Sequence, residues 1–475
     1  MIGRQKEEEK LNEIFHSGKA EFVAVYGRRR VGKTFLVNET FKGRITFHHA
    51  GLSPIEIEGK GALAAQLSHF YTSLKYQGLE GEKRPETWFD AFYLLERLLD
   101  KKDDGSRQIV FIDEMPWLDT PRSSFVTAFE GFWNTWGCAR SNLMLIVCGS
   151  ASSWILDRLI NNHGGLYGRV THEIKLAPFT MKECKAFFES NEVRLSDYDI
   201  AQSYMVVGGI PYYLGFFRKG YSVAQSIDDM FFSKSSVLRD EFNRLFAAVF
   251  ERPETVKQIV RFLFTRRCGY KRAEITKATG LKEGEKLSES LNALIASDFI
   301  LKYVPFGHSK RDAYYKLVDP FCLFYLHFAD NKDSLTSDFW KQNVSSQNVV
   351  SWRGLAFENL CFQHVAQIKE ALGIRAVRTN ESTLIKRWGK KGMQLDLLIV
   401  RDDNIINMCE LKFYNKEFVV DKAYYKELMD RQGRLEEMIP PKMVVHQTLI
   451  TTEGLKYNAY STVFSNVITL EDILA

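Results

Sequence analysis

Cysteine is scarce in this sequence, and no two cysteines have the spacing of a zinc ligand pair. The seven cysteines are spread over 475 residues without a CxxC pair, and most lie inside apolar runs. Such thiols are typical of a reduced protein interior, so the sequence favours neither a disulfide framework nor a cysteine zinc site. Proline is scarce as well, with 11 residues, while hydrophobic residues make up 45% of the chain. This composition excludes a disordered, collagen-like or low-complexity chain.

Long apolar runs are absent too. No run of about 18 apolar residues is free of charges, and the first residues contain no hydrophobic segment of the signal-peptide type. We therefore expect a cytoplasmic protein that has no membrane as a partner. At roughly 150 residues per domain, the chain is long enough for two to four domains.

Positive charge is concentrated in one segment. The net charge is only +5, but residues 250–318 contain 14 Lys and Arg against 8 Asp and Glu, a balance of +6. The rest of the chain is therefore close to neutral. A basic segment of this kind is a candidate contact for a polyanion, so we expect DNA as a partner.

The first half of the chain alternates strand-like and helix-like patterns. Apolar runs predict strands at 22–26, 109–112 and 143–148, and an amphipathic stretch at 88–99 predicts a helix. This alternation is typical of an α/β fold with a parallel sheet covered on both faces. We expect this core to span residues 1–177.

The middle of the chain predicts two further regions. Residues 178–249 are mostly helical, with a break at Gly208, and we expect them to form a lid. Residues 250–330 follow the pattern of a winged helix, with three helices and then two strands around a polar turn. The polar stretch 331–346 is the expected linker to a last domain at 345–475.

The predicted recognition helix of the winged helix, residues 283–297, is poorly suited to reading bases because it exposes Glu285 and Glu289. We expect phosphate contacts to come from other cations of the same region. These cations are Arg266, Arg267, Lys271 and Arg272. Packing between domains is the alternative role for this region.

A phosphate-binding loop follows the first predicted strand. Residues 27–34 have the sequence GRRRVGKT, the complete GxxxxGK[ST] pattern, between a strand and a helix. In such a loop backbone N–H groups surround the phosphates at the helix N-terminus. Lys33 is expected to neutralise phosphate oxygens, and Thr34 to offer its hydroxyl to Mg²⁺. The expected nucleotide-binding residues of the loop are Gly27, Arg30, Val31, Gly32, Lys33 and Thr34.

Two carboxylates, Asp113 and Glu114, follow the strand 109–112. Open α/β sheets bind ligands at the carboxyl ends of their strands. We therefore expect Asp113 to organise Mg²⁺ and Glu114 to deprotonate the attacking water. Ser150 follows the strand 143–148, and its hydroxyl is expected near the γ-phosphate, with a helix N-cap as the alternative.

The last domain contains an acidic hairpin. Two predicted strands, 393–401 and 405–414, are joined by a three-residue turn. Counting outward from this turn places Asp396 opposite Glu410, with Cβ atoms about 5 Å apart, and Lys412 on the same face. This is the D…ExK arrangement of metal-dependent phosphodiesterases, in which the carboxylates bind Mg²⁺ or Mn²⁺ and the lysine activates or orients the water.

The predicted helix 352–372 contributes one more carboxylate. Glu358 falls within an apolar stripe of this helix, and a buried carboxylate without a partner is costly, so we expect Glu358 to be a further metal ligand. Removing Asp396 or Glu410 should leave the metal-free protein at least as stable, because their like charges repel. Two alternatives stay open: a structural hairpin in which Glu410 pairs with Lys412, and a nuclease-like fold without cleavage.

Six short motifs occur together in the first half of the chain. They are Ile2-Gly3-Arg4, the loop from Tyr26 to Thr34, Asp113-Glu114-Met115-Pro116-Trp117, Cys148-Gly149-Ser150-Ala151, Leu166-Tyr167-Gly168-Arg169 and Gly208-Gly209-Ile210-Pro211-Tyr212. Together they resemble the archaeal-type P-loop ATPases of the AAA/STAND grouping. The resemblance implies that Gly3 and Arg4 line the adenine pocket, that Pro211 lies at a lid edge over the nucleotide, and that Arg169 is an arginine finger. An ordinary surface ion pair is the alternative for Arg169.

The same family commonly carries a winged helix and a C-terminal module similar to PD-(D/E)xK nucleases. The Pro-Asp opening of that motif is Leu395-Asp396 here. The resulting fold class is α/β: a P-loop NTPase parallel sheet with a helical lid, then a winged helix and a nuclease-like α/β domain.

We expect an ATPase that uses ATP and Mg²⁺ and controls a C-terminal nuclease-like domain acting on DNA. The intact set of Glu358, Asp396, Glu410 and Lys412 favours this enzyme. The acidic recognition helix favours an alternative, a signalling switch whose last domain only binds nucleic acid or a protein. In either case a homo-oligomer is compatible with an arginine finger that acts between subunits.

Overall fold

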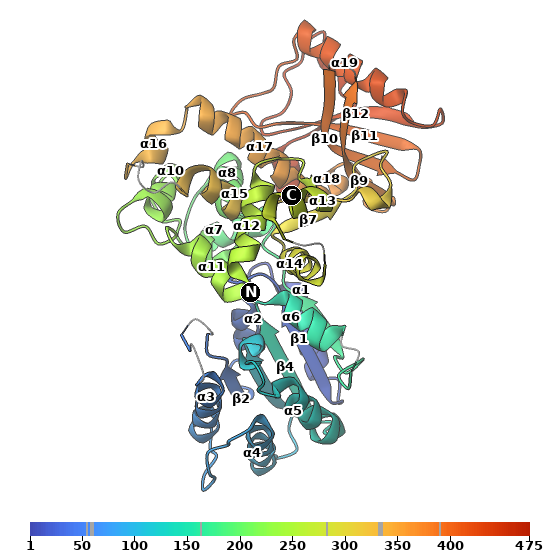
Figure 1. The fold of residues 1–475 in the computed structure, drawn as a ribbon. Helices are drawn as coiled ribbons and strands as arrows, with labels where there is room; N and C mark the ends of the chain where they lie inside the picture. Colours follow the sequence, from blue (N-terminus) through green and yellow to red (C-terminus); the bar gives the residue numbers. More distant parts are fainter. Residues whose placement is uncertain (54–55, 58–60, 162–163, 282–283, 331–335, 389–390) are drawn as a thin grey trace. The chain divides into compact units, whose positions relative to one another are not determined.

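The computed structural model describes residues 1–475 apart from 54–55, 58–60, 162–163, 282–283, 331–335 and 389–390 (Figure 1). The chain divides into two compact units, and the division runs through helices α11, α12 and α14, whose bounds are Glu241–Val249, Pro253–Phe264 and Glu285–Ala296. The first unit consists of Met1–Pro178, Asn243–Val256 and Ser288–Asp298. The second consists of Phe179–Phe242, Lys257–Leu287 and Phe299–Ala475.

A five-stranded parallel sheet forms the centre of the first unit, as the sequence predicts. The strands lie in the order β2-β3-β4-β1-β5. Every residue of β1, β3 and β4 is buried, which explains their continuous apolar sequences. The strand bounds are β1 Glu21–Tyr26, β2 Ile45–Ala50, β3 Gln108–Asp113, β4 Leu143–Gly149 and β5 His172–Lys175.

Helices cover this sheet (Figure 1). Apolar side chains of α3, α4 and α5 share one core with Phe22, Val110 and Leu145 of the strands. The start of α4 is fixed by a capping box, in which the Thr87 hydroxyl accepts from the backbone of Asp90 and the Asp90 carboxylate accepts from the backbone of Thr87. The helices of this unit are α1 Gln5–Phe15, α2 Lys33–Thr40, α3 Ala62–Tyr76, α4 Trp88–Lys101, α5 Phe125–Gly131 and α6 Ser152–Ile155.

The second unit begins with a helical region. Its helices are α7 Met181–Ser190, α8 Asp197–Val207, α9 Pro211–Leu214 and α10 Val223–Ile227. The predicted break at Gly208 is present, since this residue has φ 66° and ends α8. Gly209 is needed for close packing, because a Cβ there would lie 1.9 Å from the carbonyl oxygen of Phe179. The region is therefore helical and interrupted where the sequence predicts.

The elements expected for a winged helix occur in the expected order. A three-stranded antiparallel sheet has the order β6-β8-β7. Its strands are β6 Tyr270–Lys271, β7 Ile300–Tyr303 and β8 Tyr314–Leu317, and α13 spans Arg272–Thr279. Helix α14 begins at Glu285, and residue 283 of the predicted recognition helix lies outside the described residues.

The last part of the chain forms a second five-stranded sheet, in the order β13-β12-β11-β10-β9 (Figure 1). The pairs β9/β10 and β10/β11 are antiparallel, while β11, β12 and β13 are parallel. Helix α19, Lys422–Glu436, connects β11 to the parallel strand β12. The strands are β9 Thr379–Trp388, β10 Lys391–Arg401, β11 Ile405–Lys412, β12 Val444–Thr451 and β13 Asn466–Ile468, and α20 spans Leu470–Leu474.

The single helix predicted at 352–372 is wrong in its extent. Two helices occupy the region, α17 Gln347–Gln363 and α18 Val365–Ala371, with a break at His364. The buried face of α17 also differs from the predicted stripe. Its buried side chains include Trp352, Phe357 and Leu360, whereas Leu355 and Phe362 of the predicted stripe are half-buried.

Part of the predicted linker 331–346 is packed. Residues 331–335 lie outside the described residues, but α15 Pro320–Phe324 is followed by a further helix, α16 Phe339–Asn343. Trp340 of α16 is 1% exposed and packs edge-to-face against Trp352 and Phe324. The carboxylate of Asp228 accepts the N–H of Trp340 at 2.7 Å. The polar sequence hid this helix because a single tryptophan carries its packing.

The break at His364 has a clear physical cause. The ring is 1% exposed, and its Nε2 accepts the N–H of Met181 at 3.0 Å, so Nδ1 carries the proton and donates to the Leu360 carbonyl at 2.9 Å. Burial lowers the pKa of His364 from 6.5 to about 4, although the bond to Leu360 raises it. The neutral ring thus ties the start of α7 to the junction of α17 and α18.

We predict that this histidine makes folding sensitive to acid. Between pH 7 and pH 5 the unfolded chain takes up a proton at His364 that the folded chain refuses, which lowers the free energy of unfolding by about 2 kcal/mol. Urea unfolding should show that His364→Gln loses about this much less stability over the same pH interval. The exposed His16 is the control, and equal pH profiles for His364→Gln and His16→Gln would contradict the prediction.

Candidate functional site

The backbone of the phosphate-binding loop has the left-handed conformations that its glycines permit. Gly27 has φ 145°, and a Cβ at this position would lie 2.3 Å from the Leu176 carbonyl oxygen. Gly32 has φ 95° and caps α2, while Arg30 reaches φ 71° without being glycine. The loop therefore turns tightly into the N-terminus of α2, as a phosphate site requires.

Lys33 is the first residue of α2 and is 5% exposed. Its ammonium donates to the carbonyl oxygens of Gly27 at 3.1 Å and of Arg28 at 3.0 Å. Burial lowers the pKa of Lys33, and the charges of Glu114 and Asp113 oppose that shift. The ammonium is thus held inside the loop by two carbonyl groups that phosphate oxygens can replace.

Thr34 and Asp113 meet at the carboxyl edge of the sheet. The Thr34 hydroxyl donates to Asp113 Oδ2 at 2.6 Å. Asp113 is 6% exposed, and burial raises its pKa while the hydrogen bond from Thr34 lowers it. A hydroxyl and a carboxylate at hydrogen-bond distance are oxygen donors of the kind that Mg²⁺ prefers, so these two residues fit the predicted metal role.

Glu114 lies beside Asp113 in a left-handed conformation, with φ 44°. The hydroxyl of Ser150 donates to its carboxylate at 2.8 Å, and the N–H of Ser150 donates to the same group at 3.0 Å. The sequence predicts Ser150 near the γ-phosphate, and the structure places its hydroxyl on Glu114. Ser150 therefore orients the proposed base, a contact that no sequence spacing indicates.

The residues named from the resemblance lie in different places. Arg4 is 5% exposed and donates to the carbonyl oxygens of Val31 at 3.1 Å and of Ala177 at 2.8 Å, so it braces the phosphate-binding loop. Gly3 precedes it with φ 60°. Arg169 is exposed. Pro211 is the first residue of α9 in the second unit, and its role at the nucleotide stays a prediction, as do the roles of Gly3 and Arg169.

The β10/β11 ladder has the predicted register from the pair of Leu397 and Cys409 to the pair of Val400 and Ile406. The predicted pair of Asp396 and Glu410 lies one step beyond these residues, so their opposition stays a prediction. Asp396 also lies at a bulge, because the β9/β10 register shifts between Leu395 and Leu398. Bulges are common beside functional sites, where they redirect a side chain.

Glu410 is held in a dense network. Its carboxylate accepts from Lys412 at 2.8 Å, from Arg431 at 2.9 Å and from the Tyr424 hydroxyl. Burial alone would raise the pKa of Glu410, but the charges of Lys412 and Arg431 outweigh burial and lower this pKa below its usual value. The sequence did not point to Tyr424 and Arg431, since both come from α19, whose spacing shows no motif.

Glu358 and Asp396 form a separate acidic pair. The Glu358 side chain is 18% exposed, and burial followed by the charge of Asp396 raises its pKa to about 7. Arg267 lies 3.5 Å from its carboxylate. Asp396 accepts a hydrogen bond from the Gln394 side chain at 2.9 Å. The two carboxylates are therefore close enough for the charge of Asp396 to act on Glu358.

The four predicted residues of this domain thus fall into two groups, Glu358 with Asp396 and Glu410 with Lys412. Within the ranges that the structure describes, no three acidic, histidine or cysteine side chains are close enough to hold a metal ion. The oxygen chemistry of Glu358 and Asp396 fits a divalent cation, whereas Glu410 is already neutralised by Lys412 and Arg431.

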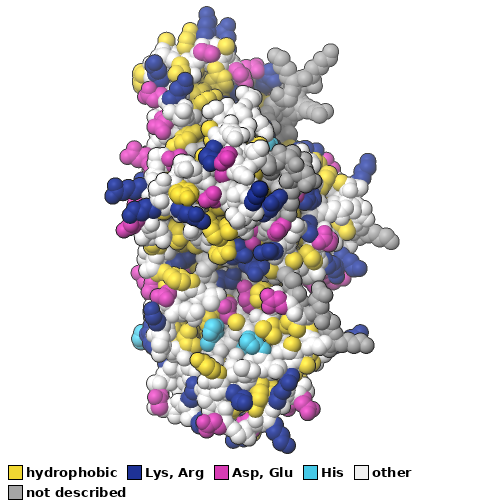
Figure 2. All heavy atoms as spheres, turned by 90° about the vertical axis from the view of Figure 1, so that its left-hand side faces the viewer, with side chains coloured by type: hydrophobic (Ala, Val, Ile, Leu, Met, Phe, Trp, Pro, Cys, Tyr) yellow, Lys and Arg dark blue, Asp and Glu magenta, His cyan; other side chains and the backbone are white. Residues whose placement is uncertain are grey.

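Two of the cations expected to contact phosphates form ion pairs within the chain. Arg266 pairs with Glu274 at 2.8 Å, and Lys271 pairs with Asp312 at 2.6 Å. On the face drawn in Figure 2, positive and negative side chains are mixed and lie among small hydrophobic patches. The described part of that face therefore presents no continuous basic surface for DNA.

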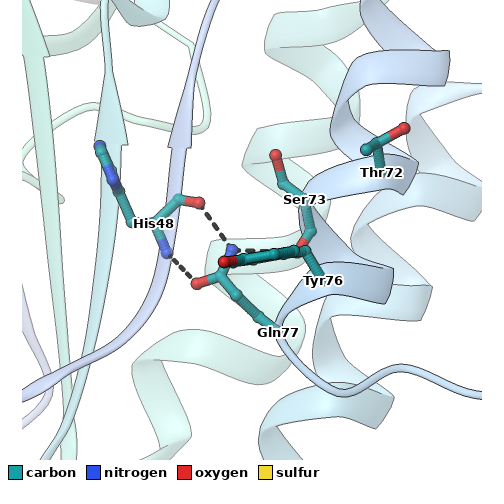
Figure 3. A pocket seen from close by; sticks show the side chains of 5 residues that line it. All are labelled: His48, Thr72, Ser73, Tyr76 and Gln77. Carbon is teal, nitrogen blue, oxygen red and sulfur yellow. Dashed lines mark hydrogen bonds between the residues drawn. The ribbon is translucent and has the colours of Figure 1, made fainter.

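A cavity of about 380 Å³ lies between β2 and α3, and none of its lining residues is a predicted site residue (Figure 3). The Gln77 amide pairs with the backbone of His48, accepting its N–H and donating to its carbonyl, each at 2.8 Å. The ring of His48 stacks on Phe111, and His49 is 2% exposed. Both histidines are thus part of the packing around β2. The cavity is lined by His48, Thr72, Ser73, Tyr76 and Gln77.

Comparison with known proteins identifies the N-terminal part of the chain. Residues 1–217 match a family model for an ATPase domain found predominantly in Archaea. MJECL04, an uncharacterized protein of Methanocaldococcus jannaschii, is 25% identical over 438 residues, which cover 90% of this chain and 88% of that protein. The N-terminal region is therefore similar to ATPase domains of the archaeal type. Across the described residues, no helix has the length and apolar character needed to cross a membrane.

Two solved structures show weaker likenesses. The Walker-type ATPase PABY2304 of Pyrococcus abyssi is 18% identical with a TM-score of 0.44, and the match covers 69% of this chain and 96% of that one. The ORC2 protein of Aeropyrum pernix, in ADPNP and ADP complexes, is 14% identical with a TM-score of 0.43, covering 70% and 94%. At these scores neither likeness bears on the function of this chain.

We predict opposite stability effects at the two carboxylates of the hairpin. From the sequence, removal of Glu410 is expected to leave the metal-free protein at least as stable. The structure reverses this expectation, because Glu410→Gln leaves Lys412 and Arg431 beside a neutral group. The substitution should lower the free energy of unfolding by about 3 kcal/mol. Asp396→Asn relieves repulsion with Glu358 and should change stability by less than about 0.5 kcal/mol or raise it. Urea unfolding with EDTA measures both, and equal stability of Glu410→Gln and wild type would show that the network adds nothing.

Proposed function

We propose that this protein hydrolyses ATP and that its nucleotide state controls a C-terminal metal-dependent nuclease-like domain acting on DNA. One observation carries the ATPase part. A phosphate-binding loop, a buried lysine and two carboxylates meet at one edge of a parallel sheet, with Thr34 hydrogen-bonded to Asp113 at 2.6 Å. The family match of residues 1–217 supports ATP as the nucleotide.

Each residue of the nucleotide site has a distinct part in hydrolysis. Lys33 exchanges its two carbonyl partners for phosphate oxygens and neutralises their charge. Thr34 and Asp113 would hold Mg²⁺, which would supply charge stabilisation for the phosphate. Glu114, oriented by Ser150, accepts a proton from the attacking water.

Arg169 is proposed to stabilise the charge of the transferring phosphate. Its side chain is exposed, which suits an arginine supplied to a neighbouring copy in a homo-oligomer. The nucleotide contacts proposed for Gly3, Arg4 and Pro211 rest on the resemblance of their motifs.

The C-terminal domain is proposed to cleave DNA. Glu358 and Asp396, with Glu410, would hold Mg²⁺ or Mn²⁺, which would supply an activated water and charge stabilisation. Lys412 lies between Glu410 and the aromatic ring of Tyr424, where it orients a water or a phosphate oxygen. The register of β10 and β11, in which Leu397 pairs with Cys409, supports this proposal.

A second candidate function is an ATP-dependent regulatory switch whose last domain only binds nucleic acid or a protein. The observation that favours it is the saturation of Glu410 by Lys412, Arg431 and Tyr424, which leaves that carboxylate little capacity for a metal. DNA cleavage assays separate the two candidates.

We predict that two substitutions divide nucleotide binding from hydrolysis. Lys33→Ala should abolish ATP binding, because α2 then has no buried cation to neutralise the phosphate charge. Glu114→Gln should bind ATP as wild type does but reduce turnover at least about 100-fold, since the amide accepts no proton. Equilibrium binding of a fluorescent ATP analogue and phosphate release measure the two effects, and normal turnover in Glu114→Gln would remove Glu114 as the base.

We predict that DNA cleavage and ATP hydrolysis fail separately. Asp396→Ala should end Mg²⁺- or Mn²⁺-dependent cleavage of DNA while ATP hydrolysis continues, because the two chemistries use residues of different units. Linear, circular and single-stranded DNA are incubated with the full chain, with and without ATP. The matched control is Asp402→Ala, an exposed carboxylate in the turn of the same hairpin. A stable wild type that cuts no DNA under any of these conditions would favour the switch.

A further inference from the structure

Lys316 lies beside the acidic pair of the C-terminal domain although it comes from an earlier part of the chain. It is on β8, and its ammonium lies 5.3 Å from the centre of the Phe362 ring on α17. Burial lowers the pKa of Lys316, and the carboxylates of Glu358 and Asp396 are the strongest opposing charges. Both acidic groups therefore lie within electrostatic range of the Lys316 ammonium.

Hydrogen bonds on both sides of the β7/β8 hairpin fix this position. The carbonyl oxygen of Val318 accepts from the Asn359 side chain at 2.6 Å, directly beside Glu358 on α17. On the other strand, the hydroxyl of Ser382 donates to Val304 at 2.9 Å, and the N–H of Phe306 donates to Thr383 at 2.8 Å. The hairpin is therefore hydrogen-bonded to both α17 and β9. Lys316 lies on the hairpin strand β8.

Lys316 forms no ion pair with the described carboxylates near it. Among the described residues, no carboxylate lies within 4 Å of the Lys316 ammonium, and the ion pair of Glu358 is the 3.5 Å contact with Arg267. Lys412 differs, since it lies 2.8 Å from Glu410 in a closed network. Of these two lysines, Lys412 is held in an ion pair, whereas Lys316 has no carboxylate within ion-pair distance among the described residues.

We propose that Lys316 binds the phosphodiester backbone of the DNA strand and positions it against Glu358 and Asp396. The inference rests on the proposed function and refines it, because the site then includes the β7/β8 hairpin as well as the C-terminal sheet. A lysine ammonium supplies three donors to phosphate oxygens, and the two carboxylates supply the metal-facing side. Lys316 is a positioning residue in this arrangement, and Lys412 keeps Glu410 charged.

The test compares Lys316→Met, Lys316→Arg and Lys302→Met in the full-length, nucleotide-free protein. Lys302 is the matched control, since it is exposed on the neighbouring strand β7 of the same hairpin. Fluorescence anisotropy measures the affinity for a labelled DNA oligonucleotide in Ca²⁺ and in EDTA, so that the metal-dependent part is isolated. Thermal melting checks the folding of each variant, and Lys316→Gln replaces Lys316→Met if the latter is destabilised.

Lys316→Met should weaken the metal-dependent binding about 10-fold and reduce the slope of log K against log salt by about one unit, as loss of one phosphate contact requires. Lys316→Arg should recover most of the affinity, and Lys302→Met should change it less than about 2-fold. Mn²⁺ binding should be unchanged or tighter in Lys316→Met, because a cation beside the carboxylates has been removed.

Equal DNA affinity and salt slope in Lys316→Met and Lys302→Met would overturn the inference, even if the wild type cleaves DNA. A wild type that cleaves no DNA, combined with weakened metal-dependent binding in Lys316→Met, would reject cleavage and support the inference. Absence of any metal-dependent DNA binding in the wild type would overturn both.

Discussion

The hydrogen bond between the Thr34 hydroxyl and the Asp113 carboxylate joins segments 79 residues apart, and the N-terminal site depends on it. It forms because β1 and β3 are parallel, with β4 between them, so their carboxyl ends meet at one edge. The same geometry brings Ser150, at the end of β4, onto Glu114. A single rule of sheet topology thus brings together Lys33 and Thr34, Asp113 and Glu114, and Ser150 from three distant segments.

The C-terminal domain contrasts two ways of burying a carboxylate. Glu410 is balanced by Lys412 and Arg431 and has a lowered pKa, so it stays charged at neutral pH. Burial and the charge of Asp396 disfavour the ionised form of Glu358, so its pKa rises to about 7. The balanced charge of Glu410 is typical of a structural network. The raised pKa of Glu358 is typical of a ligand-binding group. A bound cation would therefore change the ionisation of Glu358 and Asp396 more than that of Glu410.

The sequence predicted features that depend on local pattern. The parallel sheet, the phosphate-binding loop and the register of β10 and β11 follow from periodicity, glycine spacing and a short turn. It missed contacts made by distant segments. The break at His364 depends on the N–H of Met181, the helix within the predicted linker depends on one buried tryptophan, and the network around Glu410 depends on α19. None of these partners is a neighbour in sequence, so no spacing could have indicated them.

The amide of Gln77 has a consequence for how copies of this protein associate. β2 is the edge strand of the parallel sheet, and the Gln77 side chain occupies the outward N–H and carbonyl of His48. A strand from another molecule would need these groups to extend the sheet. The edge is therefore closed to strand addition at this point, which protects it from aggregation.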